Sequence, residues 1–232
     1  MCSSLDSRIL IRGVFCLLIA VTVCRAQNPE TIVFVFSDVP VPASILNVAE
    51  QRASEIFLKA GIEIEWINCR FASDPACNRT FGPRDVSLRI TPSVSNATSD
   101  AAFGVAWLDR NGAGRYADIF WKRVEHLNEQ TNINIGLILG SVMAHEMGHL
   151  LGVKSHAVKG LMTSRWGTAE LQAMQMGTLL FLPGQDKQMR APSRSLMVAR
   201  ETGTVPDRVT SFIAQDEQFR VCHYHACPFL SH

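Results

Sequence analysis

Three histidines and a glutamate between residues 145 and 156 have the types and spacing of a zinc site. His145 and His149 are four residues apart, so in a helix they project from one face about one turn apart. This geometry suits two imidazole nitrogens on one tetrahedral Zn²⁺. Glu146, beside the first histidine, is placed to act as general base on water activated by the metal. We therefore predict His145, His149 and His156 as metal ligands and Glu146 as the catalytic residue.

The residues before His145 indicate a buried helix, because positions 135–143 are apolar nearly all round. Polar side chains placed in such a helix cost on the order of a few kcal/mol unless something satisfies them, and a metal does so. The alternative is a pair of ordinary core histidines. Gly152 permits a sharp exit from the helix, after which His156 can return to the metal as a third ligand.

The N-terminus has the composition of a secretory signal. Arg8 and Arg12 precede a run over residues 14–24 that is apolar except for Thr22, and small residues occupy the positions that signal peptidase prefers, ending at Ala26. We expect cleavage after residue 26 and a secreted or periplasmic protein. Two alternatives are a lipoprotein modified at Cys24 and an uncleaved N-terminal anchor.

The remaining composition fits one domain of modest size. The chain has 232 residues, 47% hydrophobic and 19% charged, which is enough for a sizeable core. We assign residues 27–192 to this domain and leave residues 193–232 as an unassigned tail. Removing residues 1–26 changes the formal net charge from +1 to −1. This balance favours neither nucleic acid nor an anionic membrane surface as a partner.

Four cysteines remain after cleavage, an even number that suits an oxidising compartment. Of the three possible pairings, we favour the local pairs Cys69–Cys77 and Cys222–Cys227. Histidines between the second pair leave open a second metal site, although a small disulfide loop is the simpler interpretation.

Periodicity and turn residues predict an alternation of strands and helices. Strands are expected at 31–37, 62–67, 86–90, 102–108 and 116–121, with a hairpin turn at Asn111-Gly112. Helices are expected at 42–60, at 132–151, and from about 167 to a point before Pro183 or Ala191.

This element order, together with the motif His145-Glu-x-x-His149 followed by Gly152 and His156, resembles the metzincin clan of zinc metallopeptidases. The chain is similar to uncharacterised secreted bacterial metzincin-like proteins. The resemblance implies an α+β, zincin-like fold. A twisted mixed five-stranded sheet would pack on a helix and on the active-site helix, and a C-terminal helix would follow a Met-turn-like segment at Gly160–Met162. Met162 read by itself is equally an ordinary core methionine.

The resemblance also implies function. It predicts a zinc-dependent endopeptidase whose extended peptide substrate pairs with an edge strand at 102–108, two elements before the active-site helix. We expect a monomer without stable membrane insertion. The alternative is a catalytically inactive zinc-binding or interaction protein on the same scaffold, with a tail residue such as His225 closing the site as a fourth ligand.

One departure concerns the third ligand. The family pattern places it at position 155, which is serine here, and His156 follows one residue later. A loop absorbs one residue at little cost. The competing ligand is Glu170, 21 residues after His149, at a spacing that resembles thermolysin-like gluzincins. Its alternative role is a carboxylate in the first turn of a helix.

Overall fold

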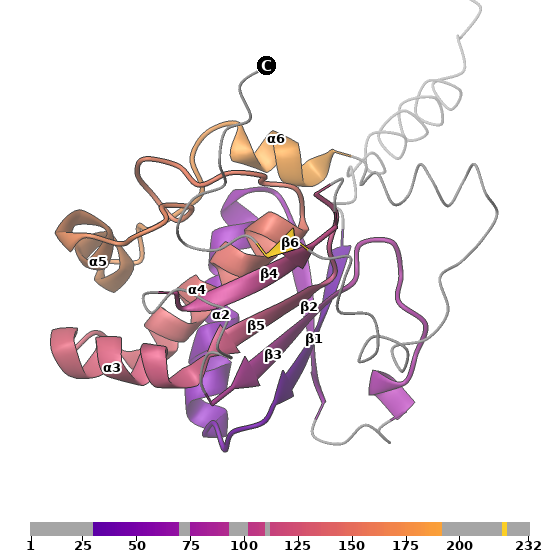
Figure 1. Ribbon diagram of the computed structural model, residues 1–232, viewed down its shortest axis with the longest axis horizontal. Coiled ribbons are helices and arrows are strands. Elements are labelled where there is room, and N and C mark those ends of the chain that lie inside the picture. Colours follow the sequence, from indigo (N-terminus) through magenta and orange to yellow (C-terminus); the bar gives the residue numbers. More distant parts are fainter. Residues whose placement is uncertain (1–29, 70–74, 93–101, 110–111, 192–219, 222–232) are drawn as a thin grey trace, which may run out of the picture.

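The computed structural model describes residues 30–69, 75–92, 102–109, 112–191 and 220–221 (Figure 1). The expected signal peptide and the Cys222–Cys227 pair lie outside these residues. Within them, no helix combines the length and apolar character needed to cross a membrane. The elements are, in chain order, β1 (Glu30–Ser37), α2 (Ala43–Lys59), β2 (Glu63–Cys69), η1 (Pro75–Cys77), β3 (Val86–Thr91), β4 (Gly104–Leu108), β5 (Tyr116–Phe120), α3 (Trp121–Thr131), α4 (Ile135–Leu150), α5 (Thr168–Gln175), α6 (Gln185–Arg190) and β6 (Arg220–Val221).

The strands form one mixed sheet in the order β2-β1-β3-β5-β4-β6. Strands β2, β1, β3 and β5 run parallel to one another, whereas β4 runs antiparallel to β5 and to β6. The predicted mixed sheet of five strands is therefore present, and the two-residue strand β6 extends it. The antiparallel pairing of β4 and β5 agrees with the predicted hairpin. Gly112 there has a φ of 76°, which favours glycine.

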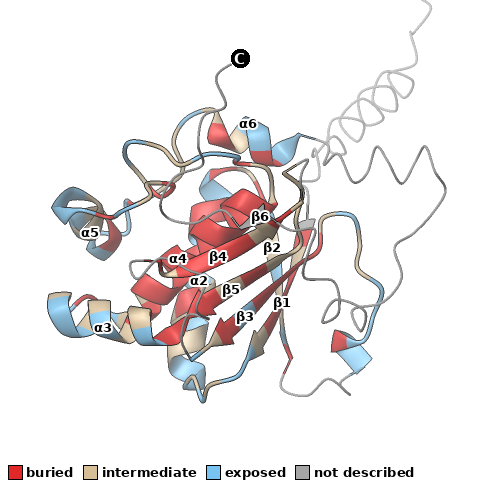
Figure 2. Ribbon diagram, in the orientation of Figure 1, coloured by how far each residue is buried: buried red, intermediate tan, exposed pale blue. Residues whose placement is uncertain are grey.

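Helices α2 and α4 cover one face of the sheet (Figure 1). Between them and the strands lies the main core, which includes Val33, Leu88, Ile119 and Phe57. Gly140 lets the two helices approach closely, because a β-carbon there would lie 2.4 Å from the backbone oxygen of Ala49. In Figure 2 the helix α4 and the central strands are almost entirely buried. Helix α4, which contains His145, Glu146 and His149, is thus enclosed between α2 and the sheet.

The predicted disulfide between Cys69 and Cys77 is confirmed, with an S–S distance of 2.06 Å. It closes the loop after β2 and packs with Phe34 in a second, smaller core cluster. This covalent link joins the end of β2 to η1.

Two predicted elements differ in the structure, and two further elements were not predicted. Trp121 begins α3 rather than ending β5, and α3 itself was not predicted, since only Trp121 and Val124 of its residues are buried. A mostly polar helix with so short an apolar stripe leaves no clear periodicity. The expected helix after residue 167 is two short helices, separated by Gly177 and Gly184, whose positive φ values interrupt it. The two-residue strand β6 was also not predicted.

Candidate metal centre

Helix α4 positions the first two histidines. It begins at Ile135 rather than at 132, because Asn132 ends α3 in a left-handed conformation and the side chain of Asn134 accepts a hydrogen bond from the N–H of Gly136 at 2.8 Å. Residues Ile138–Leu150 are all buried. The predicted burial of this helix is confirmed, and His145, Glu146 and His149 are part of its enclosed surface.

The three predicted ligands meet at one point. One nitrogen each from His145, His149 and His156 lies within 4.8 Å of the others. The two Nε2 atoms of His149 and His156 are 3.3 Å apart. His145 and His149 are buried, and His156 is half-buried. The cluster is therefore reached from solvent on the His156 side.

Backbone carbonyls fix the orientation of the two helical histidines. Nδ1 of His145 donates to the oxygen of Leu161 at 2.8 Å, and Nδ1 of His149 donates to the oxygen of Val153 at 2.7 Å. A carbonyl only accepts, so the proton of each neutral ring is on Nδ1 and the lone pair is on Nε2. Such a partner behind the ring is typical of histidines that bind metals.

Burial keeps these imidazoles neutral. It lowers the pKa of His145 well below its ordinary value and that of His149 to about 4, with neighbouring histidines adding to both effects. The pKa of His156 is also lowered by burial. Neutral imidazole is the form that binds a metal ion, so all three rings are ready to act as ligands at neutral pH.

Gly152 directs the chain from α4 back to His156. Its φ of 121° is accessible to glycine, and a β-carbon there would lie 3.1 Å from the backbone oxygen of Gln188. The N–H of Val153 donates to the oxygen of Gly148 at 2.9 Å, which closes the turn. The extra residue before His156 is thus accommodated after the turn, and His156 rather than Ser155 joins the cluster.

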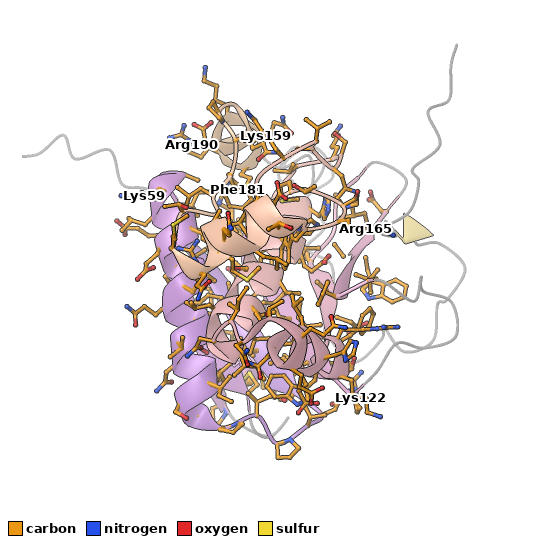
Figure 3. All side chains as sticks on the ribbon, turned by 90° about the vertical axis from the view of Figure 1, so that its left-hand side faces the viewer. Lys59, Lys122, Lys159, Arg165, Phe181 and Arg190 are labelled. Atoms are coloured by element: carbon orange, nitrogen blue, oxygen red, sulfur yellow. A yellow bond between two sulfur atoms is a disulfide. The ribbon has the colours of Figure 1, made fainter. Side chains whose placement is uncertain are left out.

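Met162 packs against α4 at Gly148. The chain turns tightly from Gly160 to Thr163, whose N–H donates to the oxygen of Gly160 at 3.2 Å. A β-carbon on Gly148, between the two histidines, would lie 2.8 Å from the sulfur of Met162 and 2.8 Å from a ring carbon of Phe181. Phe181 also packs on Phe57, 5.2 Å between ring centroids, and is seen near the Lys59 end of α2 in Figure 3.

Glu146 is buried between α4 and β4, with 2% of its surface exposed. The backbone N–H of Ala106 donates to its carboxylate, while among the described residues Oε1 has no hydrogen-bond partner. Burial raises the pKa of Glu146 to about 8, and the charge of Asp118 adds to this effect. In the metal-free protein a carboxyl group with this pKa keeps its proton near neutral pH. The positive charge of a bound metal ion would lower the pKa and favour the carboxylate, which is the form that accepts a proton.

Glu170 does not join the histidine cluster. Its carboxylate accepts from the N–H of Gly167 at 3.1 Å, at the start of α5. This is the helix-terminal role that was the alternative for this residue. In the described part of the chain, the metal-ligating cluster contains the three histidines and no carboxylate.

The donor set fits zinc. Two nitrogens at about 2.0–2.1 Å from a tetrahedral Zn²⁺ are about 3.3 Å apart. The Nε2 atoms of His149 and His156 have this separation. The widest separation in the cluster is 4.8 Å, so binding would draw the nitrogens together by about 1.5 Å. Three neutral nitrogen ligands leave a position for a further ligand.

Four contributors to the site were missed by sequence reasoning. Gly104, Ala106 and Asp118 surround Glu146, and Trp166 packs against His145 at 6.1 Å between ring centroids. Only Gly104 carried a usable signal, since glycine inside a strand marks close approach of another group.

Comparison with known proteins gives a structural likeness but no sequence match. No family model and no curated protein matches the chain. Among solved structures, the archaemetzincin of Methanopyrus kandleri is similar at a TM-score of 0.44 and 17% identity, covering 75% of this chain and 99% of that chain. The chemistry proposed below follows from the geometry of the chain's own residues.

Proposed function

We propose that this chain is a zinc-dependent endopeptidase of zincin type that hydrolyses peptide bonds, with His145, His149 and His156 as metal ligands and Glu146 as general base. One observation carries the proposal: a buried carboxyl group with one unengaged oxygen lies on the helix that supplies two of the three clustered, neutral imidazoles. A purely structural zinc site has no need of such a base. We also propose export, which the Cys69–Cys77 disulfide supports.

Each of the site residues has its own role in the proposed hydrolysis. Zinc, when bound, supplies a Lewis acid that polarises a carbonyl and lowers the pKa of water toward neutrality. The three histidines would hold the metal, and the carbonyls of Leu161 and Val153 fix two of the imidazoles with Nε2 available as a ligand. Glu146, steadied by the N–H of Ala106, accepts a proton from the attacking water and delivers it to the leaving amine.

We propose that the substrate lies along β4 in extended form. Strand β4 is not the outermost strand of the described sheet, contrary to the prediction, because β6 pairs with Trp107 and Leu108. It is also three elements before α4, since α3 intervenes. Gly104–Ala106 is not paired with β6, and these residues border Glu146. Main-chain pairing there would place a peptide bond beside the carboxylate.

The test compares purified wild type with Glu146→Gln and, as a matched carboxyl-to-amide control, Glu170→Gln. We expect one zinc per chain in all three proteins. Cleavage of a mixed peptide library should occur in wild type and Glu170→Gln only, stop with a chelator, and return with zinc. Wild type without zinc, or full cleavage by Glu146→Gln, would refute the proposal. Zinc in every protein with cleavage in none would favour a non-catalytic zinc-binding protein.

A further inference from the structure

Trp166 shares a hydrogen-bond acceptor with a predicted metal ligand. Its indole N–H donates to the oxygen of Leu161 at 3.1 Å, and Nδ1 of His145 donates to the same oxygen at 2.8 Å. Trp166 is 9% exposed, so this contact is shielded from water. The carbonyl that orients His145 is therefore held by a second donor as well as by its own backbone, whose N–H donates to the oxygen of Leu180 at 3.0 Å.

The ring of Trp166 connects two parts of the site. It meets His145 edge-on, 6.1 Å between centroids at 79°, and it stacks on Phe103, 5.7 Å between centroids at 27°. Phe103 directly precedes β4, and its oxygen accepts from the N–H of Phe120 at 2.8 Å. It therefore lies at the end of the strand whose Gly104 and Ala106 surround Glu146.

We infer that Trp166 is a positioning residue of the metal centre, an inference that rests on the proposed function. Through the Leu161 carbonyl it fixes the ring of His145. Through Phe103 it sets the distance between the segment that contains the three histidines and strand β4, whose Ala106 donates a hydrogen bond to Glu146. Partners behind the ligands of metal sites are worth about 10- to 100-fold in metal affinity or activity. The two contacts of Trp166 should therefore affect two different measurements.

Loss of the indole N–H is tested by Trp166→Phe, which keeps an aromatic ring for stacking. The matched control is Trp66→Phe, because Trp66 also donates its N–H, to Oγ of Ser54 at 2.8 Å, between β2 and α2. Zinc affinity of the full-length proteins is measured by competition with a chelator, and Co²⁺ spectra report the ligand geometry. We expect Trp166→Phe to bind zinc about 10-fold more weakly with an altered Co²⁺ spectrum. Trp66→Phe should match wild type.

Loss of the stacking contact is tested by Phe103→Leu. This variant keeps the hydrogen bond to Leu161, so we expect zinc affinity within about twofold of wild type and kcat lowered about 10-fold. Thermal unfolding of the metal-free proteins identifies a general folding defect, which would appear equally in Trp66→Phe.

The outcomes separate the inference from the proposed function. Zinc affinity and a Co²⁺ spectrum of Trp166→Phe that equal those of wild type would overturn the positioning role, whether or not peptides are cleaved. A weakened affinity in Trp166→Phe together with no peptide cleavage by any protein would contradict the peptidase proposal and support the positioning role. Wild type that binds neither metal would overturn both.

Discussion

A β-carbon on Gly104 would lie 2.9 Å from Oε1 of Glu146 and 2.8 Å from the backbone oxygen of Asp118. Any other residue at this position therefore collides both with the carboxylate of α4 and with the neighbouring strand β5. Glycine here allows the side chain of the general base to lie directly against β4. The relationship links a strand residue with no reactive group to the proposed chemistry.

Gly104→Ala should impair cleavage without removing the metal. The added methyl displaces Glu146, and overpacking of this kind costs about 1–3 kcal/mol. We expect kcat/KM to fall at least about 100-fold while one zinc per chain is retained, because a small misplacement of a catalytic group has an effect of this size. The control is Gly167→Ala, where the new β-carbon meets only Glu170 at an ordinary 3.5 Å. Equal activity in the two variants would contradict the explanation.

The third ligand is tested by comparing His156→Ala with Glu170→Gln. His156 lies in the cluster, so its removal should weaken zinc binding by at least about 100-fold, as loss of one of three protein ligands requires. Glu170→Gln should bind zinc normally and lose about 0.5 kcal/mol of stability from its helix-terminal contact. Chelator competition gives the affinities. A normal affinity in His156→Ala with loss in Glu170→Gln would assign the ligand to Glu170 instead.

The raised pKa of Glu146 should be visible in the stability of metal-free protein. Between its ordinary pKa of 4.5 and its folded pKa of about 8, the native state keeps a proton that the unfolded chain has released. The contribution is therefore fully present below the unfolded pKa and is lost as pH rises through the folded pKa. Thermal unfolding of chelator-treated protein should show wild type losing more stability than Glu146→Gln between about pH 5 and 8. Parallel pH profiles would show that Glu146 is not buried as described.

Arg52 should contribute strongly to the free energy of unfolding. Its buried guanidinium, on α2, donates to the oxygens of Gly177 at 3.0 Å and Leu179 at 2.7 Å. Arg52→Met leaves the buried carbonyl of Leu179 without this donor and removes the part-buried contact to Gly177, so it should cost about 2–3 kcal/mol in urea denaturation. Arg89→Met removes an exposed pair with Asp38 and should cost less than about 1 kcal/mol. Comparable losses in the two variants would argue against a special role for Arg52.

The sequence predicted the elements with strong periodicity and the grouping of the three histidines. Helix α4 was recognisable because its apolar residues are continuous, and His156 because Gly152 precedes it. The groups that orient these side chains could not be predicted, since Leu161, Val153 and Ala106 act through backbone atoms that any residue type carries. Met162 was ambiguous for a related reason: a methionine beneath a metal site and one in an ordinary core have the same apolar neighbours.

The contacts that orient the histidines and those that surround Glu146 come from separate stretches of this chain. The three histidines, the carbonyls that orient two of them and the indole that steadies one of those carbonyls all lie between His145 and Trp166. The surroundings of Glu146 come instead from Gly104, Ala106 and Asp118 on the sheet. Under the proposed function, a variant changed only at these strands would lose peptide cleavage and still bind zinc. A single substitution in these strands would then convert the proposed zinc peptidase into a protein that only binds zinc.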